Sequence, residues 1–233
     1  MKKFKRVLAL AMAVILSVPT IITTGMGTVP VKAAGDTVEL TVSSESAKYA
    51  GYETRKMYAG GNYAYCVQPS KKTPQSGTYE KHYDVENYVS NAGDETQALQ
   101  SRNLAYYCWG APGFSASYFP STWYDGSAMD DDKYIALSHI MLSFLVSYDE
   151  VGSMHGCNSS FKNWVYQNVL GYNANGDLVN GQATLPILCW ATAPASFKVY
   201  ILSTGSATQN ILGYEYTPTG TVSLSKTSAN TGI

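Results

Sequence analysis

Charged residues are scarce in this chain, and so are histidine and cysteine. Asp, Glu, Lys and Arg make up 14% of the 233 residues, with only three His and four Cys. No two cysteines have C-x-x-C spacing and the histidines do not cluster, so the sequence offers none of the usual zinc patterns. We therefore expect no metal and no cofactor. Beyond the first 33 residues, no apolar run is long enough to predict a membrane span.

Residues 1–33 have the pattern of a secretory signal peptide. The cationic "MKKFKR" precedes the apolar "VLALAMAVILSVPTII", and small residues at Val31 and Ala33 predict cleavage after Ala33. This segment holds five of the 16 Lys and Arg and none of the 17 Asp and Glu, so the remainder carries 11 basic and 17 acidic side chains, a net charge of −6. An exported protein this acidic is not built to bind nucleic acid or anionic lipid.

The residues that are abundant indicate a folded extracellular domain. The chain has 19 tyrosines and a hydrophobic content of 45%, enough for a core in about 200 residues. Strand patterns come first, then a helical block, then strands again, which predicts an α+β fold: an antiparallel sheet or barrel with an inserted helical block, followed by the beginning of a β-sandwich repeat. The expected strands are 37–43, the hairpin 53–67 and the segments 183–191, 196–204, 209–216 and 220–226, the expected helices are 95–109, 130–148 and 158–172, and 69–84 is expected to be a loop.

Cys66 and His139 are the candidate reactive residues. Cys66 ends the second strand of a hairpin whose turn is Gly60-Gly61, so its thiol can be aimed at another element. His139 lies in the apolar helix pattern "YIALSHIMLSFLVSY", where it can be a buried core histidine or a general base. Each is also explained as an ordinary core residue.

The remaining cysteines leave the disulfide pattern open. Cys108, Cys157 and Cys189, together with Cys66, allow two disulfides in three pairings in an exported protein. Nothing in their spacing selects one pairing or requires any.

Several motifs, taken in order, resemble the thioester domain of Gram-positive surface adhesins. They are "YAYCVQP", "RNLAYYCWGAPG", "DDDKYIALSHIMLSFL" and "PASFKVYILSTGSATQNILGYEY". The resemblance spans roughly residues 38–217, nearly the whole chain after the predicted signal peptide. In this family a strand cysteine attacks the side-chain amide of a glutamine in a helical T-Q-x-A motif and releases ammonia. The resulting internal thioester can be opened by a lysine amine of the host. The resemblance implies that Cys66 is the family's cysteine.

The chain departs from this family at the glutamine. T-Q-x-A is matched by residues 138–141, so His139 stands where the family has glutamine, and an imidazole has no acyl group. Three alternatives remain: another glutamine, of which Gln97 in "TQAL" is the candidate, supplies the acyl carbon; Cys66 and His139 form an activated pair; or the domain keeps the fold without the bond.

The C-terminal segment 218–233 resembles the first strand of the SpaA-type, prealbumin-like repeats of pilins and adhesin stalks. Its "VSLSK" places Lys226 where those repeats have the lysine of an intramolecular isopeptide bond. The resemblance implies a head at 34–217 followed by further stalk domains of the same protein.

We therefore expect a secreted, cell-wall-associated adhesin head. Its partner would be a protein or amine on a host or neighbouring cell. If the domain forms a thioester, this partner would be bound covalently through chemistry at Cys66. The alternatives are a structural domain of a surface or pilin protein without covalent chemistry, and a Cys–His acyl hydrolase or transferase. A non-enzymatic role is favoured, because "YCVQP" lacks the helix start at which thiol enzymes place their thiolate.

Overall fold

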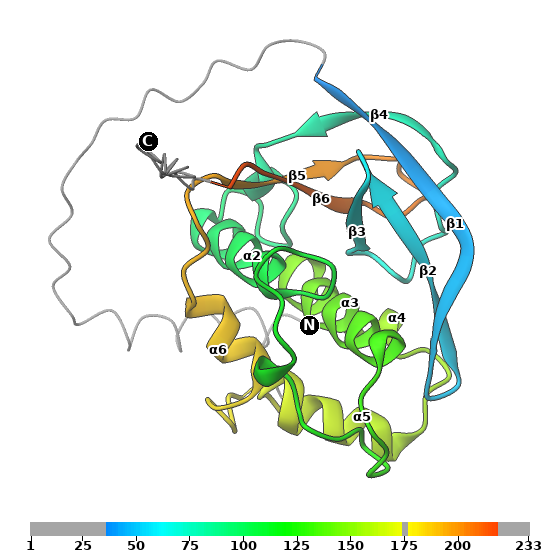
Figure 1. The fold of residues 1–233 in the computed structure, drawn as a ribbon, viewed down its shortest axis with the longest axis vertical. Coiled ribbons are helices and arrows are strands. Elements are labelled where there is room, and N and C mark those ends of the chain that lie inside the picture. The colour runs from blue at the N-terminus through cyan, green and yellow to red at the C-terminus, as the bar shows by residue number, and fades with distance from the viewer. Residues whose placement is uncertain (1–35, 174–176, 219–233) are drawn as a thin grey trace, which may run out of the picture.

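The computed structural model describes residues 36–173 and 177–218 (Figure 1). The predicted signal peptide, and Lys226 with the predicted stalk segment, lie outside these ranges. The strands are β1 (Thr37–Tyr49), β2 (Tyr52–Ala59), β3 (Asn62–Cys66), β4 (Gly77–His82), β5 (Phe197–Leu202) and β6 (Ile211–Tyr216). The helices are α2 (Glu95–Tyr107), α3 (Asp131–Ser147), α4 (Glu150–Ser153), α5 (Ser159–Val165), the π-helical turn η3 (Tyr166–Leu170) and α6 (Thr184–Trp190), with 3-10 turns at Val85–Asn87 and Ala116–Tyr118.

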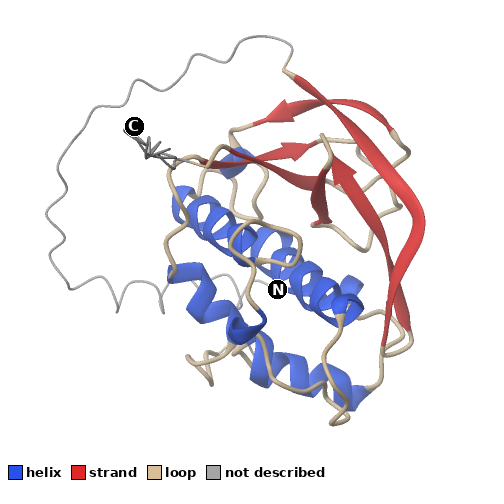
Figure 2. Ribbon diagram, viewed as in Figure 1, coloured by secondary structure: helices blue, strands red, loops and turns tan. Residues whose placement is uncertain are grey.

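The strands form a closed antiparallel barrel. Their order is β1-β2-β3-β6-β5-β4, so β5 and β6, the last two strands that the structure describes, are inserted between β3 and β4. β1 is the longest strand, and it pairs with β2 on one side and β4 on the other, with a bulge between Val42 and Ser46. The α+β prediction with an antiparallel barrel is confirmed (Figure 2).

Helices α2 and α3 lie beneath the barrel, and α5 and α6 lie on the side away from it (Figure 1). Both long helices begin directly after an acidic N-cap residue. The Asp94 carboxylate accepts the Gln97 N–H at 2.9 Å, and the Asp130 carboxylate accepts the Lys133 N–H at 3.0 Å. α3 is buried along most of its length and ends at Tyr148, which has a left-handed conformation. This helix is therefore a central core element and not a surface helix.

Two predicted elements are wrong. Segment 183–191 was expected to be a strand but forms α6, since Pro186 falls in the first helical turn, where its missing N–H costs no hydrogen bond. A short apolar run alone does not separate a buried strand from a buried helix. Segment 69–84 was expected to be a loop but contains β4, whose polar outward-facing residues hide the alternation.

Two cores result from this arrangement. The larger one fills the space between the barrel and the helical layer and includes Tyr63, Tyr65 and most of α3. The smaller one lies inside the barrel and includes Ala64 and Cys66. β3 thus contributes alternate side chains to two separate cores, as the two-residue period of a strand requires.

Candidate functional site

The thiol of Cys66 faces the interior of the barrel. Cys66 is 3% exposed at the end of β3, on the same strand face as Ala64. Burial raises the pKa of this thiol to about 12, and the negative charge of Asp149 adds to the effect, while a hydrogen bond from the Thr54 hydroxyl opposes it. Cys66 is therefore held as a neutral thiol.

His139 touches Cys66 at the backbone and not at the sulfur. It is 1% exposed in the middle of α3, and its Nδ1 accepts the backbone N–H of Cys66 at 3.2 Å. The neutral ring then carries its proton on Nε2, which lies 3.3 Å from the Tyr63 hydroxyl. Both rings that pack edge-on against the imidazole, Tyr63 and Tyr65, point away from the barrel interior.

The surroundings of His139 keep it uncharged. Burial lowers the pKa of the imidazole to about 4. Protonation at Nδ1 would also remove the acceptor for the Cys66 N–H. In the part of the chain that the structure describes, no hydrogen bond joins the imidazole to the thiol. The two predicted residues are therefore neighbours, but His139 supports the backbone of the strand that carries Cys66 and does not contact its sulfur. An activated Cys66–His139 pair gains no support from this geometry.

Gln209, which the sequence reasoning did not weigh, shares a cavity with Cys66. Cys66 pairs with Ile211 across the β3–β6 ladder, and Gln209 lies two residues earlier, on the same face as Ile211. The ladder continues one step beyond the strands, because the Val67 N–H donates to the Asn210 carbonyl at 3.1 Å. Diagonal neighbours of this kind are typically about 7–8 Å apart, within reach of a long side chain.

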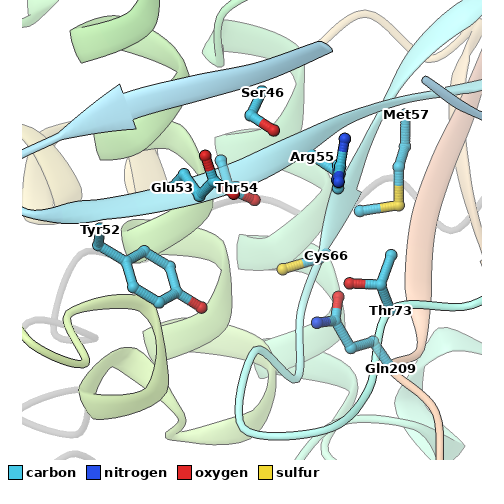
Figure 3. Close-up of a pocket in the computed structure, with 9 residues that line it drawn as sticks. All are labelled: Ser46, Tyr52, Glu53, Thr54, Arg55, Met57, Cys66, Thr73 and Gln209. Atoms are coloured by element: carbon cyan, nitrogen blue, oxygen red, sulfur yellow. The ribbon is translucent and has the colours of Figure 1, made fainter. Parts of the chain in front are cut away.

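The shared cavity has a volume of about 140 Å³. Figure 3 shows the side chains of Cys66 and Gln209 directed into it from β3 and from the segment before β6. The residues that line it are Ser46, Tyr52, Glu53, Thr54, Arg55, Met57, Cys66, Thr73 and Gln209.

The amide of Gln209 is only half satisfied. Gln209 is 6% exposed, and its Nε2 donates to the Lys71 carbonyl at 3.0 Å, whereas its Oε1 is buried and has no hydrogen-bond partner among the residues that the structure describes. A buried acceptor left unpaired costs about 1–3 kcal/mol. Such an atom beside a reactive residue type calls for a functional explanation.

The loop that follows Cys66 is held in place by hydrogen bonds to two other parts of the chain. Its Ser70 donates both its N–H, at 2.8 Å, and its hydroxyl, at 2.5 Å, to the Asp149 carboxylate, just after α3. The same loop reaches the segment between β5 and β6, because the Asn210 N–H donates to Gln68 Oε1 at 3.3 Å. The segment that follows Cys66 is thus tied both to the helical layer and to the segment carrying Gln209.

The other predicted site residues lie elsewhere. Gln97 is buried near the start of α2, and its side-chain amide donates to the Ser90 hydroxyl at 2.9 Å and to the Leu145 carbonyl. It does not line the Cys66 cavity. Lys226 lies outside the described residues.

The described part of the chain comprises residues 36–173 and 177–218. The four cysteines all lie in this part of the chain, and all are buried and unpaired there. No group of three or more His, Cys, Asp or Glu side chains within these ranges is arranged to hold a metal ion. None of their helices has the length and apolar character to cross a membrane.

The signal that could have found Gln209 is a local one. In "ATQNILGYEY" the glutamine stands two residues before a strand with inward-facing apolar positions, so it continues the inward face. Which strand would lie beside it depends on a pairing between segments more than a hundred residues apart, and no local pattern carries that information.

Comparison with known families gives one match. The family model described as "Thioester domain" matches residues 37–175, a range that includes Cys66 and His139 and ends before Gln209. No curated protein and no solved structure matches the chain. Because the matched range covers more than half of the sequence and contains the cysteine strand and its supporting helix, this chain belongs to the thioester domain family.

Proposed function

We propose that Cys66 and Gln209 form an internal thioester, and that the protein is a secreted surface adhesin that uses this bond to attach covalently to a target amine. The single observation that carries the proposal is the shared cavity, where a buried thiol and a buried, half-satisfied carboxamide enter from diagonally opposed strand positions. The family match supports the same chemistry.

The bond would form without any cofactor. The Cys66 sulfur attacks Cδ of Gln209, the thiol proton passes to the departing nitrogen, and the C–N bond breaks to release ammonia. The product is an acyl group held by sulfur between two side chains, Cys66 and Gln209, that are only 3% and 6% exposed. An amine that later enters reverses this chemistry: its nitrogen bonds to Cδ, the C–S bond breaks, and the sulfur regains a proton.

The geometry favours this function over a Cys–His hydrolase. A hydrolase needs an imidazole that takes the proton from the thiol, but His139 contacts the Cys66 backbone, and its lowered pKa makes it a weak base. The raised thiol pKa suits a group that reacts once, with an amide held beside it, better than one that must be a thiolate in every turnover. In the proposed function His139 holds β3 in place by accepting the Cys66 backbone N–H.

Export and wall association rest on the sequence pattern at residues 1–33 and on the family. The partner proposed is a protein amine on a host or neighbouring cell surface. Stalk repeats beginning at residue 218, with Lys226 in an isopeptide bond, remain part of the proposal.

Intact mass of the secreted protein tests the bond. We expect the parent to be one ammonia lighter than its sequence, and methylamine to restore mass while labelling Gln209 in a peptide map. Cys66→Ala and Gln209→Glu should lack the deficit. Gln182→Glu, which changes an exposed glutamine away from the cavity, should keep it. A parent of full sequence mass would refute the thioester, and a deficit that survives Gln209→Glu would refute Gln209 as the acyl partner.

A further inference from the structure

The loop Lys71–Thr73 wraps around Gln209. The Gln209 backbone N–H donates to the Lys72 carbonyl at 2.9 Å, and its side-chain Nε2 donates to the Lys71 carbonyl at 3.0 Å. Lys72 is also bridged to Thr208. Two successive carbonyls of the loop therefore hold the backbone and the amide nitrogen of the same glutamine.

The hydrogen bond to the Lys71 carbonyl sets the orientation of the Gln209 side-chain amide. With Nε2 fixed on the Lys71 carbonyl, Oε1 is turned to the other side, where it is buried and accepts no hydrogen bond from any described residue. In the proposed reaction Nε2 is the atom that leaves, and Oε1 is the atom on which negative charge develops when the sulfur attacks Cδ. The loop thus supports the leaving group, while the oxygen has no donor in the ground state.

Thr73 is placed to become that donor. It directly follows Lys72 in the loop and lines the same cavity as Cys66 and Gln209. Within the described ranges its hydroxyl makes no hydrogen bond to the protein, so it is free to turn. Figure 3 shows the hydroxyl directed into the cavity beside the Gln209 amide, on the side of Cys66.

We propose that Thr73 is a catalytic residue, whose hydroxyl donates a hydrogen bond to the acyl oxygen of Gln209 as that oxygen becomes an oxyanion. The proposal rests on the Cys66–Gln209 thioester proposed above. The tetrahedral carbon carries the oxyanion both when the thioester forms and when an amine opens it, so one donor serves both steps. Its hydrogen bond is absent with the thiol free and forms as Cδ becomes tetrahedral, a common behaviour of catalytic contacts.

The expected effect follows from the cost of removing one such donor. A buried oxyanion donor contributes about 10²–10³ in rate. Thr73 is exposed at the edge of the cavity, where water can replace part of its contribution. We therefore expect loss of the hydroxyl to slow methylamine opening by about tenfold to a hundredfold.

The experiment follows the mass of the full secreted chain during methylamine treatment. Thr73→Val removes the hydroxyl and keeps the shape, Thr73→Ser keeps the hydroxyl, and Thr41→Val removes an exposed threonine hydroxyl on β1, outside the cavity. We expect slow opening in the valine variant alone. Should thermal unfolding show that Thr73→Val is not folded, Thr73→Ala provides the same comparison without a branched side chain.

The outcomes distinguish failure of the Thr73 proposal from failure of the thioester. A folded Thr73→Val protein that opens tenfold more slowly, or that lacks the ammonia deficit while Thr73→Ser has it, supports the hydroxyl. Opening within twofold of the parent, or equal losses in Thr73→Val and Thr73→Ser, overturns Thr73 and leaves the thioester standing. A parent without any deficit overturns both proposals.

Discussion

Replacing His139 by alanine should weaken the fold without changing the reactivity of the Cys66 thiol. The imidazole is buried, and it is the acceptor for the Cys66 backbone N–H. Its removal leaves that N–H unpaired, at about 1–3 kcal/mol, and opens a cavity next to Tyr63 and Tyr65, for which large-to-small changes typically cost about 2–5 kcal/mol. Since the two costs overlap, we expect a loss of about 3–5 kcal/mol in the free energy of unfolding.

His139→Gln is the matched variant. A glutamine side chain is of similar size, and its amide oxygen can accept the Cys66 N–H as the imidazole does. It is also the residue that the adhesin family resemblance expects at this position. We expect His139→Gln to lose no more than about 1–2 kcal/mol, within the range of ordinary conservative core changes.

Two assays distinguish a structural role of His139, as the acceptor of the Cys66 N–H, from a role as a base for the Cys66 thiol. Denaturant unfolding gives the free energies, and iodoacetamide alkylation of Cys66 against pH, read by peptide mapping, gives the thiol midpoint. The alkylation series is run in a Gln209→Ala background so that the thiol stays free. We expect a midpoint well above the free value of about 8.5 in all three proteins. A midpoint that shifts in His139→Ala while the free energy of unfolding changes by less than about 0.5 kcal/mol would refute the structural role.

Two further predictions concern acid stability and Gln97. The pKa of His139 falls from 6.5 in the unfolded chain to about 4 in the fold, so the unfolded state binds more protons between these values, and stability present above pH 6.5 is lost as the pH falls toward 4. At about 1.4 kcal/mol per pKa unit, the parent should lose about 3 kcal/mol more than His139→Gln between pH 7 and pH 4, and equal losses in the two proteins would contradict this. Gln97→Leu should cost about 1–3 kcal/mol by leaving the Leu145 carbonyl without its donor but keep the ammonia deficit, and a folded Gln97→Leu protein of full mass would restore Gln97 as the acyl partner.

The features that the sequence predicted correctly are those that depend on neighbours along the chain. Gly60 and Gly61 have positive φ and form the turn that brings β3 back beside β2. The helices predicted at 95–109 and 130–148 form, and Asp94 and Asp130 cap their N-termini. Cys66 was placed on a strand and His139 in a buried helix for the same reason, and both placements are confirmed.

The features that the sequence did not predict depend on distant pairing or on competition between local signals. Gln209 is opposite the end of β3 only because β6 enters the barrel between β3 and β5. The direction of the Cys66 thiol, away from His139, follows from strand alternation combined with the position of α3 on the outer face of β3. Segment 183–191 forms α6 because Pro186 fits the first turn of a helix, a signal that competes with the strand-like apolar run around it.

The position of Gln209, two residues before β6, determines how mechanical load would pass through an attached molecule. After an amine opens the proposed thioester, the target is bonded to the Gln209 side chain, and the chain leaves the barrel after Tyr216, at the far end of β6. Tension between the target and the downstream chain then runs along residues 209–216 and bypasses the helical layer and the other strands. β6 is held in shear between β3 and β5, and even if it were pulled out, the target would stay joined through covalent bonds. Resistance of the tether to force would therefore be independent of how stable the rest of the domain is.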